Sequence, residues 1–261
     1  MKGRSLEWLV PPALVVAFFL AWELYVSLSG ISRFILPPPS RIWGAFIELL
    51  QTPSTLRHAL ITVQETLFGF AIAIFIGVGL GTLLGKIGWL ERAMHPFVVA
   101  TQVVPKIALV PLFILWFGFG MTSKVVIAAV LSFFPILTNT ILGVKSVARG
   151  HREVMQSLNA GRWSSFFLLE LPSSLPYILT GMEVGIVLAT IGAVVGEYLG
   201  GSQGLGSLAV ETLNALQVDT LFAVILLLTL IGLALYLAIA TLRRFIIPWH
   251  ESARPARGPG A

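Results

Sequence analysis

The feature that most constrains the fold is a series of six long apolar runs, near residues 8–28, 59–84, 95–117, 124–144, 175–198 and 219–242. Each approaches the ~20 residues that an α-helix needs to cross about 30 Å of hydrocarbon. Membrane barrel strands are about half as long and alternate in polarity, so these runs predict helices. Only 11% of the residues are charged, whereas a soluble domain carries about 25%. The sequence therefore predicts an all-α integral membrane protein with six transmembrane helices.

The distribution of Lys and Arg predicts the orientation of these spans, because cytoplasmic loops are enriched in both. The first run follows the basic start MKGRSLEW without a small-residue cleavage site, so we interpret it as a retained span. With the N-terminus inside, the external pieces hold only Arg33, Arg41, Arg57 and Lys124. The cytoplasmic pieces hold Lys2, Arg4, Lys86, Arg92, Lys145, Arg149, Arg152, Arg162, Arg243, Arg244, Arg254 and Arg257. Both termini are expected in the cytoplasm of a multi-pass membrane protein, and the loop 199–218 outside.

The segments outside the spans suggest a division into three parts. Residues 1–58 comprise the N-terminus, the first span and an external amphipathic segment; residues 59–245 form the five-helix transmembrane domain. Within the first part, Pro37-Pro38-Pro39 blocks a helix and Ser40 is expected to cap one over Arg41 to Leu50. The apolar positions of that helix suit the outer membrane surface: Ile42, Phe46, Leu49 and Leu50. Residues 246–261 form a polar, Pro/Gly-rich tail that we expect to be disordered.

Small residues recur every fourth position in two of the spans. They are Gly69, Ala73, Gly77, Gly81 and Gly85 in the second span, and Gly181, Gly185, Ala189 and Ala193 in the fifth. Small residues let helix backbones approach closely in lipid. The rows indicate either ordinary packing within the chain or a dimer seam. Pro96, Pro105 and Pro111 predict that the third span is bent or broken.

Ionisable residues within the apolar runs indicate either a polar path or structural ion pairs, since such groups usually face a bundle interior. Glu183, Thr190 and Glu197 are seven residues apart each time, so they share one face of the fifth span. Gln102 and Lys106 share a face of the third. A translocation path lined by these five residues, with Lys106 meeting an anionic solute, is one hypothesis. Ion pairs or side chains snorkelling at span ends are the other.

Motifs for catalysis or cofactor binding are not found in the sequence. The stretch GTLLGK at 81–86 has Leu80 and Ile87 where a phosphate-binding loop needs Gly and Ser or Thr. The Gly-rich GSQGLG at 201–206 does not join a strand to a helix, as a dinucleotide site requires. The chain has no Cys and four dispersed His, which offer no metal cluster. We expect a chain that is not an enzyme and binds no metal or cofactor of its own.

The polar stretch GHREVMQSLNAGRWSSFFLLELP at 150–172 interrupts the apolar chain between spans four and five. Residues Glu153 to Leu158 are compatible with a helix, Asn159-Ala160-Gly161 with a break, and Arg162 to Leu169 with a second helix that Leu171-Pro172 ends. The residues alone allow an amphipathic loop lying on the cytoplasmic surface.

This stretch resembles the cytoplasmic coupling loop of ABC-importer permeases, whose pattern is Glu-Ala-Ala, three residues, Gly, nine residues, Ile, one residue and Leu-Pro. Glu153 and Leu171-Pro172 match, while Val154-Met155 replace the Ala pair, Asn159 the Gly and Leu169 the Ile. Asn is among the residues that tolerate the left-handed conformation at a helix end. The stretches LPPPSRIWGAF (36–46), PKIALVPLFILWFGFG (105–120) and EYLGGSQGLGSL (197–208) are similar to the subgroup of nitrate, sulfonate, taurine and thiamine-pyrimidine-precursor permeases.

The resemblance implies the type I importer permease fold, with a coupling loop at about 148–172. It implies as partners a second copy of the permease, two ATP-binding subunits inside, a solute-binding protein outside and the lipid bilayer, but no nucleic acid. ATP and Mg²⁺ would be bound by the ATPase. The residues implied to contact the ATPase are Glu153, Val154, Met155, Leu158, Asn159, Ala160, Gly161 and Arg162, with Leu171 and Pro172 returning the loop to span five. The expected solute is a small anion like a sulfonate, taurine or nitrate; the alternatives are a thiamine pyrimidine precursor or a stand-alone secondary carrier.

Overall fold

The computed structural model describes residues 4–249, and all regular structure in that range is helical. Five helices are long and apolar enough to cross a membrane: α1 (Arg4–Ser29), α3 (Pro53–Lys86), α6 (Met121–Lys145), α11 (Val218–Ile246) and the helical stretch Arg162–Gly200 that contains α9 (Leu171–Gly200). A sixth span is formed if α4 (Gly88–Val103) and the pair η1 (Lys106–Leu109) and α5 (Val110–Phe117) are counted together. The prediction of six membrane-spanning segments is therefore confirmed, with one of them broken.

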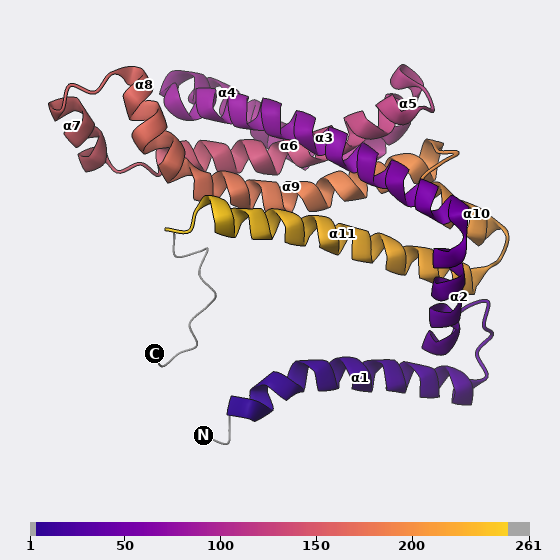
Figure 1. Ribbon diagram of the computed structural model, residues 1–261. Helices are drawn as coiled ribbons and strands as arrows, with labels where there is room; N and C mark the ends of the chain where they lie inside the picture. The colour runs from indigo at the N-terminus through magenta and orange to yellow at the C-terminus, as the bar shows by residue number, and fades with distance from the viewer. Residues whose placement is uncertain (1–3, 250–261) are drawn as a thin grey trace.

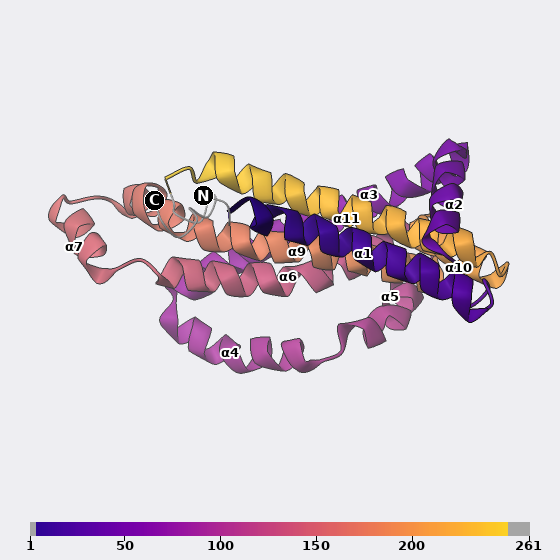
Figure 2. The same ribbon diagram turned by 90° about the horizontal axis from the view of Figure 1, so that it is seen from below.

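The break in the third span lies at Pro105, where α4 ends and the chain turns by 82°. Pro105 has no amide hydrogen to donate to a preceding turn, so an α-helix cannot continue regularly through it. Pro96 lies inside α4 and Pro111 in the first turn of α5, a position that tolerates proline. In Figure 2, α4 bows away from α6 and the chain returns to the bundle at α5.

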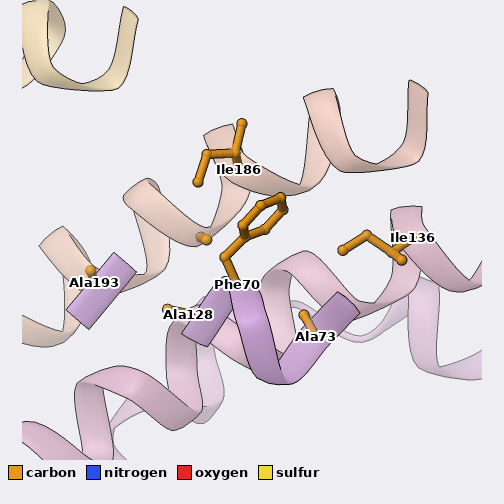
Figure 3. Close-up of a cluster of buried hydrophobic side chains, with 7 residues drawn as sticks. Phe70, Ala73, Ala128, Ile136, Ile186 and Ala193 are labelled. Atoms are coloured by element: carbon orange, nitrogen blue, oxygen red, sulfur yellow. The ribbon is translucent and has the colours of Figure 1, made fainter. Parts of the chain in front are cut away.

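The core of the bundle is formed by α3, α6 and α9, which pack along their whole lengths (Figure 1). Its centre contains Phe70 and Ala73 of α3, Ala128 and Ile136 of α6, and Ile186, Ala189 and Ala193 of α9. Figure 3 shows Phe70 projecting between α6 and α9. Helix α11 covers the outside of α9.

The rows of small residues serve packing within the chain. A β-carbon on Gly69 would lie 2.5 Å from Cβ of Ala128, and one on Gly81 would lie 2.6 Å from Cβ of Thr140, both in α6. In α9, a β-carbon on Gly185 would lie 3.0 Å from Cδ1 of Ile136. Each added β-carbon would overlap or crowd its neighbour, so the helices approach this closely only because these positions carry no side chain. Close van der Waals contact between helix backbones is a main source of helix association in lipid. The first of the two interpretations of these rows therefore describes the structure.

The short external helix α2 (Pro39–Gln51) departs from two expectations. Ser40 is not its N-cap: the helix begins at Pro39, because proline fits the first helical position, where no intrahelical amide donor is needed. Instead, the Ser40 amide and hydroxyl donate to the two oxygens of Glu23 in α1, at 2.9 and 2.7 Å. Three of the four apolar positions expected to face the membrane surface are instead buried in the protein. These are Ile42, Phe46 and Leu49, of which the last two pack with residues of α10 (Leu205–Asn214) and α11, whereas Leu50 is exposed.

Helix α1 lies at the edge of the bundle (Figure 1) and is joined to it through α2 and through Trp22, whose ring centroid lies 6.2 Å from that of Phe222 in α11. α1 begins and α11 ends at the same end of the molecule as α7 (Arg149–Ser157), and α2 and α10 lie at the other. Of the tail 246–261, expected to be disordered, residues 250–261 lie outside the described residues, while α11 includes Ile246 and Ile247 is buried.

Candidate coupling loop and polar path

The polar stretch between α6 and α9 projects from one end of the bundle (Figures 1 and 2). It consists of α7, a turn, the single-turn helix α8 (Arg162–Ser165) and the π-helical segment η2 (Phe166–Glu170). At its base, the Arg152 guanidinium donates to the carbonyl of Val144 at 3.1 Å. Lys86, at the end of α3, lies 2.6 Å from Oε2 of Glu170 and 4.2 Å from the ring centroid of Phe166. The loop is thus tied to the ends of α3 and α6.

The turn after α7 has the geometry of a Schellman motif. Asn159 has φ +50°, its amide donates to the carbonyl of Gln156, and the amide of Ala160 donates to the carbonyl of Met155, both at 2.9 Å. This pair of hydrogen bonds closes a helix around a left-handed residue, usually glycine and sometimes asparagine. Asn159, which stands where the family pattern has Gly, thus adopts the left-handed conformation that asparagine tolerates. The turn is therefore a rigid end of a helix rather than a loose connection.

The expectation that Leu171-Pro172 ends the second short helix is wrong. The chain is helical from Arg162 to Gly200, and Pro172 lies in the first turn of α9. The preceding turn is of the π type, in which the amide of Leu171 donates to the carbonyl of Phe166. A π turn frees backbone groups locally, which lets the helix continue past a residue that lacks an amide hydrogen. The loop therefore runs directly into the core helix α9.

The residues implied to contact an ATPase occupy mostly exposed positions. Val154 and Leu158 are 55% and 71% exposed, and Trp163 beside them is 76% exposed. Glu153, Asn159, Gly161 and Arg162 are also exposed; Met155, Ala160, Leu171 and Pro172 are half-buried. Projecting apolar side chains rimmed by charge are typical of a surface that binds another protein.

Two of the residues suggested for a polar path lie beside the break in the third span. Gln102 is exposed near the end of α4, and Lys106 begins η1 on the other side of the break. The Lys106 ammonium nevertheless lies 3.4 Å from the Gln102 carbonyl and 4.9 Å from the ring centroid of Phe134 in α6. A cation over an aromatic face is weakly attracted by the ring. The pair therefore remains together across the break.

The other three candidates have partners inside the chain. Glu183 accepts hydrogen bonds from the Arg243 guanidinium of α11 at 3.1 Å. Thr190 donates to the carbonyl of Ile186, and Glu197 is completely buried. The three side chains follow one another along α9, as their seven-residue spacing predicts, but each contacts different residues.

A buried ion pair between α3 and α6 was not expected from the sequence. Nζ of Lys124 lies 3.3 Å from Oε1 of Glu65, and the two side chains are 5% and 1% exposed. Lys124 had been counted as an external cation, whereas the structure places it in the first turn of α6, facing α3. The only signal in the sequence was an acidic residue in one apolar run and a lysine at the edge of another.

Comparison with known proteins identifies the family. Residues 73–250 match the family described as the binding-protein-dependent transport system inner membrane component. The chain belongs to this family. The permease is 38% identical to the riboflavin transport system permease RibX of Chloroflexus aurantiacus over 96% of each chain. It is 35% identical to the formylaminopyrimidine transport permease ThiX of Halalkalibacterium halodurans over 95% of this chain and 98% of the other.

A solved structure supports the fold. The permease superposes with a TM-score of 0.63 on a chain of the MetNI methionine ABC transporter in inward-facing conformations, at 17% identity, covering 73% of this chain and 95% of that one. The chain is thus a multi-pass inner-membrane permease of the ABC-importer type, and not an enzyme. The interpretation as a stand-alone secondary carrier is set aside by this membership.

Proposed function

We propose that two copies of this permease form the translocation path of an ATP-driven importer, with two ATP-binding subunits on the side of α7 and a solute-binding protein on the side of α10. Family membership supports this assignment of roles to separate subunits, because members of the family are the inner-membrane components of transport systems that depend on a binding protein. ATP and Mg²⁺ are then held by the ATPase, and this chain transmits movement.

The α7–α8 loop is the proposed attachment to the ATPase. The observation that carries this assignment is the exposure of three apolar side chains around a hydrogen-bonded turn: Val154 and Leu158 at the end of α7, and Trp163 in α8 after the turn. A rigid lever transmits the closing movement of a partner, whereas a loose loop would absorb it. Glu153 and Arg162, next to Val154 and Trp163 in the sequence, are placed to pair with charges of the ATPase.

Gly161→Trp is expected to uncouple the ATPase from transport. Gly161 has φ −63°, and a β-carbon there would meet no atom of the described chain within 4 Å. The indole therefore disturbs little within the permease and acts on a docked partner. ATP-dependent uptake in proteoliposomes should fall by about tenfold, which corresponds to roughly 1.4 kcal/mol of lost docking free energy.

Asn159→Gly is the matched control, because glycine adopts the left-handed conformation of this turn without strain. It should transport normally. Normal uptake and normally coupled ATP hydrolysis by the Gly161→Trp permease would show that the ATPase docks elsewhere.

For the solute we propose a nitrogen heterocycle with a flavin- or pyrimidine-like ring. The support is that two relatives aligned over almost the whole chain, at 38% and 35% identity, are named for riboflavin and formylaminopyrimidine. Uptake of radiolabelled riboflavin, formylaminopyrimidine, taurine and nitrate by the complete importer tests this assignment. Saturable, ATP-dependent uptake of taurine or nitrate, with no uptake of either heterocycle, would contradict it.

A small anion such as a sulfonate, taurine or nitrate is the second candidate, and Lys106 is the observation that favours it. Its ammonium is half-buried beside the break in the third span, without a carboxylate within 4 Å in the described chain. If the solute is anionic and meets Lys106, Lys106→Ala should raise the KM for uptake about tenfold. An unchanged KM and maximal rate would exclude a direct contact.

A further inference from the structure

The external segment 201–217 is held to the bundle through the first amides of α10. The first four amides of an α-helix lack partners within the helix. Here the amide of Gly204, just before α10, donates to Nδ1 of His58 at 3.0 Å. The amide of Leu205 donates to Oγ1 of Thr62 at 2.9 Å, and that of Gly206 to Oε2 of Glu197 at 2.7 Å. Side chains of α3 and α9 thus cap α10 in place of a local residue.

Glu197 is the centre of this attachment. Its side chain is completely buried, and its second oxygen, Oε1, accepts the Thr62 hydroxyl at 2.7 Å. The carboxylate lies at the N-terminus of α10, where the helix dipole favours negative charge. One residue of α9 therefore joins α3 and α10 through two hydrogen bonds.

The Gly-rich stretch GSQGLG is explained by this carboxylate. Gly204 has φ +100°, and a β-carbon there would overlap Oε1 and Cδ of Glu197. A β-carbon on Gly206 would lie 2.8 Å from Cβ of Glu197. The loop has the glycines of an anion-binding turn, and the anion it encloses belongs to the chain itself.

Helix α6 joins the same attachment through Lys124. Its ammonium pairs with Glu65 and also lies 3.4 Å from the carbonyl of Gln203, in the loop before α10. The outer parts of α3, α6 and α9 are therefore all bound to segment 201–217.

Glu197 lies near the far end of the helix that begins in the α7–α8 loop. The stretch Arg162–Gly200 has 39 residues, which at 1.5 Å per residue is a contour of ~58 Å. Figure 1 shows the α7–α8 loop and α10 at opposite ends of the molecule. Lys86 ties α3 to this helix at Glu170, and Thr62 ties it again at Glu197.

We propose that Glu197 is a positioning residue for transport: it transmits the movement of α9, driven at the α7–α8 loop, to the external segment 201–217. This inference rests on the proposed importer function. Glu197 makes α10 and the outer ends of α3 and α9 move as one body. When this attachment is weakened, ATP is hydrolysed but less solute is moved for each ATP.

The test uses the complete importer in proteoliposomes and measures uptake and ATP hydrolysis in the same sample. Thr62→Val keeps the shape of the side chain and removes the hydroxyl that joins Glu197 to Leu205. Glu197→Gln keeps the length of the side chain and replaces one of the two acceptor oxygens by an amide nitrogen. Both variants should lower the number of solute molecules transported per ATP by about tenfold, the scale of one lost hydrogen bond.

Two variants serve as controls. Thr62→Ser restores the hydroxyl and should restore the ratio of solute to ATP. Glu211→Gln neutralises an exposed carboxylate on α10 itself and should leave the ratio unchanged.

A purely structural role predicts a different result. Uptake and hydrolysis would then fall together at a constant ratio, or both variants would fail to assemble, and either outcome would overturn the proposal. If instead the proposed importer function is wrong, the unmodified complex will show no ATP-dependent uptake, so the two failures can be told apart.

Discussion

Gly69→Ala is expected to separate α3 from α6 and to remove most of the assembled permease from the membrane. The added β-carbon would lie 2.5 Å from Cβ of Ala128, 2.8 Å from the Val125 carbonyl oxygen and 2.9 Å from the Ala129 amide nitrogen. Two of these three atoms belong to the backbone of α6, so a change of side-chain rotamer cannot relieve the overlap. Overpacking of a core typically lowers the free energy of unfolding by about 1–3 kcal/mol. Because the neighbouring backbone of α6 is rigid, we expect a loss of about 3 kcal/mol at this site.

The measurement is the yield and thermal midpoint of the purified permease in detergent. Gly79→Ala is the matched control, since it makes the same change in the same helix where a β-carbon meets no atom of residues 4–249 within 4 Å. The control should be as stable as the parent or slightly more so, because alanine favours a helix. Equal midpoints for both variants would mean that α3 and α6 do not pack as closely as described.

Lys124→Met is expected to destabilise the permease by about 1–3 kcal/mol, because it leaves the buried polar atoms of Glu65 without their partner. Glu65 is 1% exposed and lies 3.3 Å from the Lys124 ammonium. The same substitution in an exposed pair should have little effect. Arg41 lies 3.6 Å from Asp219 with the two side chains 49% and 34% exposed, so Arg41→Met should cost less than about 1 kcal/mol.

The double variant Glu65→Met, Lys124→Met separates the ion pair from the packing around it. Replacing a buried pair by apolar side chains of similar volume is often neutral, so the double variant should recover most of the lost thermal midpoint. If Lys124→Met alone is as stable as the parent, the two charges do not depend on each other.

Features with a local cause were predictable from the sequence. The apolar runs placed the spans, and Pro96, Pro105 and Pro111 predicted that the third is bent or broken. Asparagine at position 159 is a residue type that tolerates the left-handed conformation found there. Each depends on a few neighbouring residues or on length and hydrophobicity alone. The spacing of the small residues likewise identified the packing faces of α3 and α9.

Features that depend on a distant partner were not predictable. Periodicity identifies a face of a helix, but not the helix that it meets, so Glu65 and Lys124 were seen separately. Residue type and position predicted Ser40 as the N-cap of α2. Its actual partner, Glu23, belongs to α1 and cannot be identified from the neighbouring sequence. The helix continues through Pro172 because a π turn precedes it, and that turn cannot be predicted from a residue pattern.

The buried ion pair also bears on how the protein is made. A ribosome delivers α3 to the membrane before α6, so Glu65 enters the bilayer while Lys124 is still to be translated. During that interval the carboxylate lacks its cation and the glycine face of α3 lacks its neighbour, and a polar group in lipid without a partner is costly. We therefore expect α3 to become stable in the bilayer only when α6 arrives, so that the buried pair couples the insertion of these two helices.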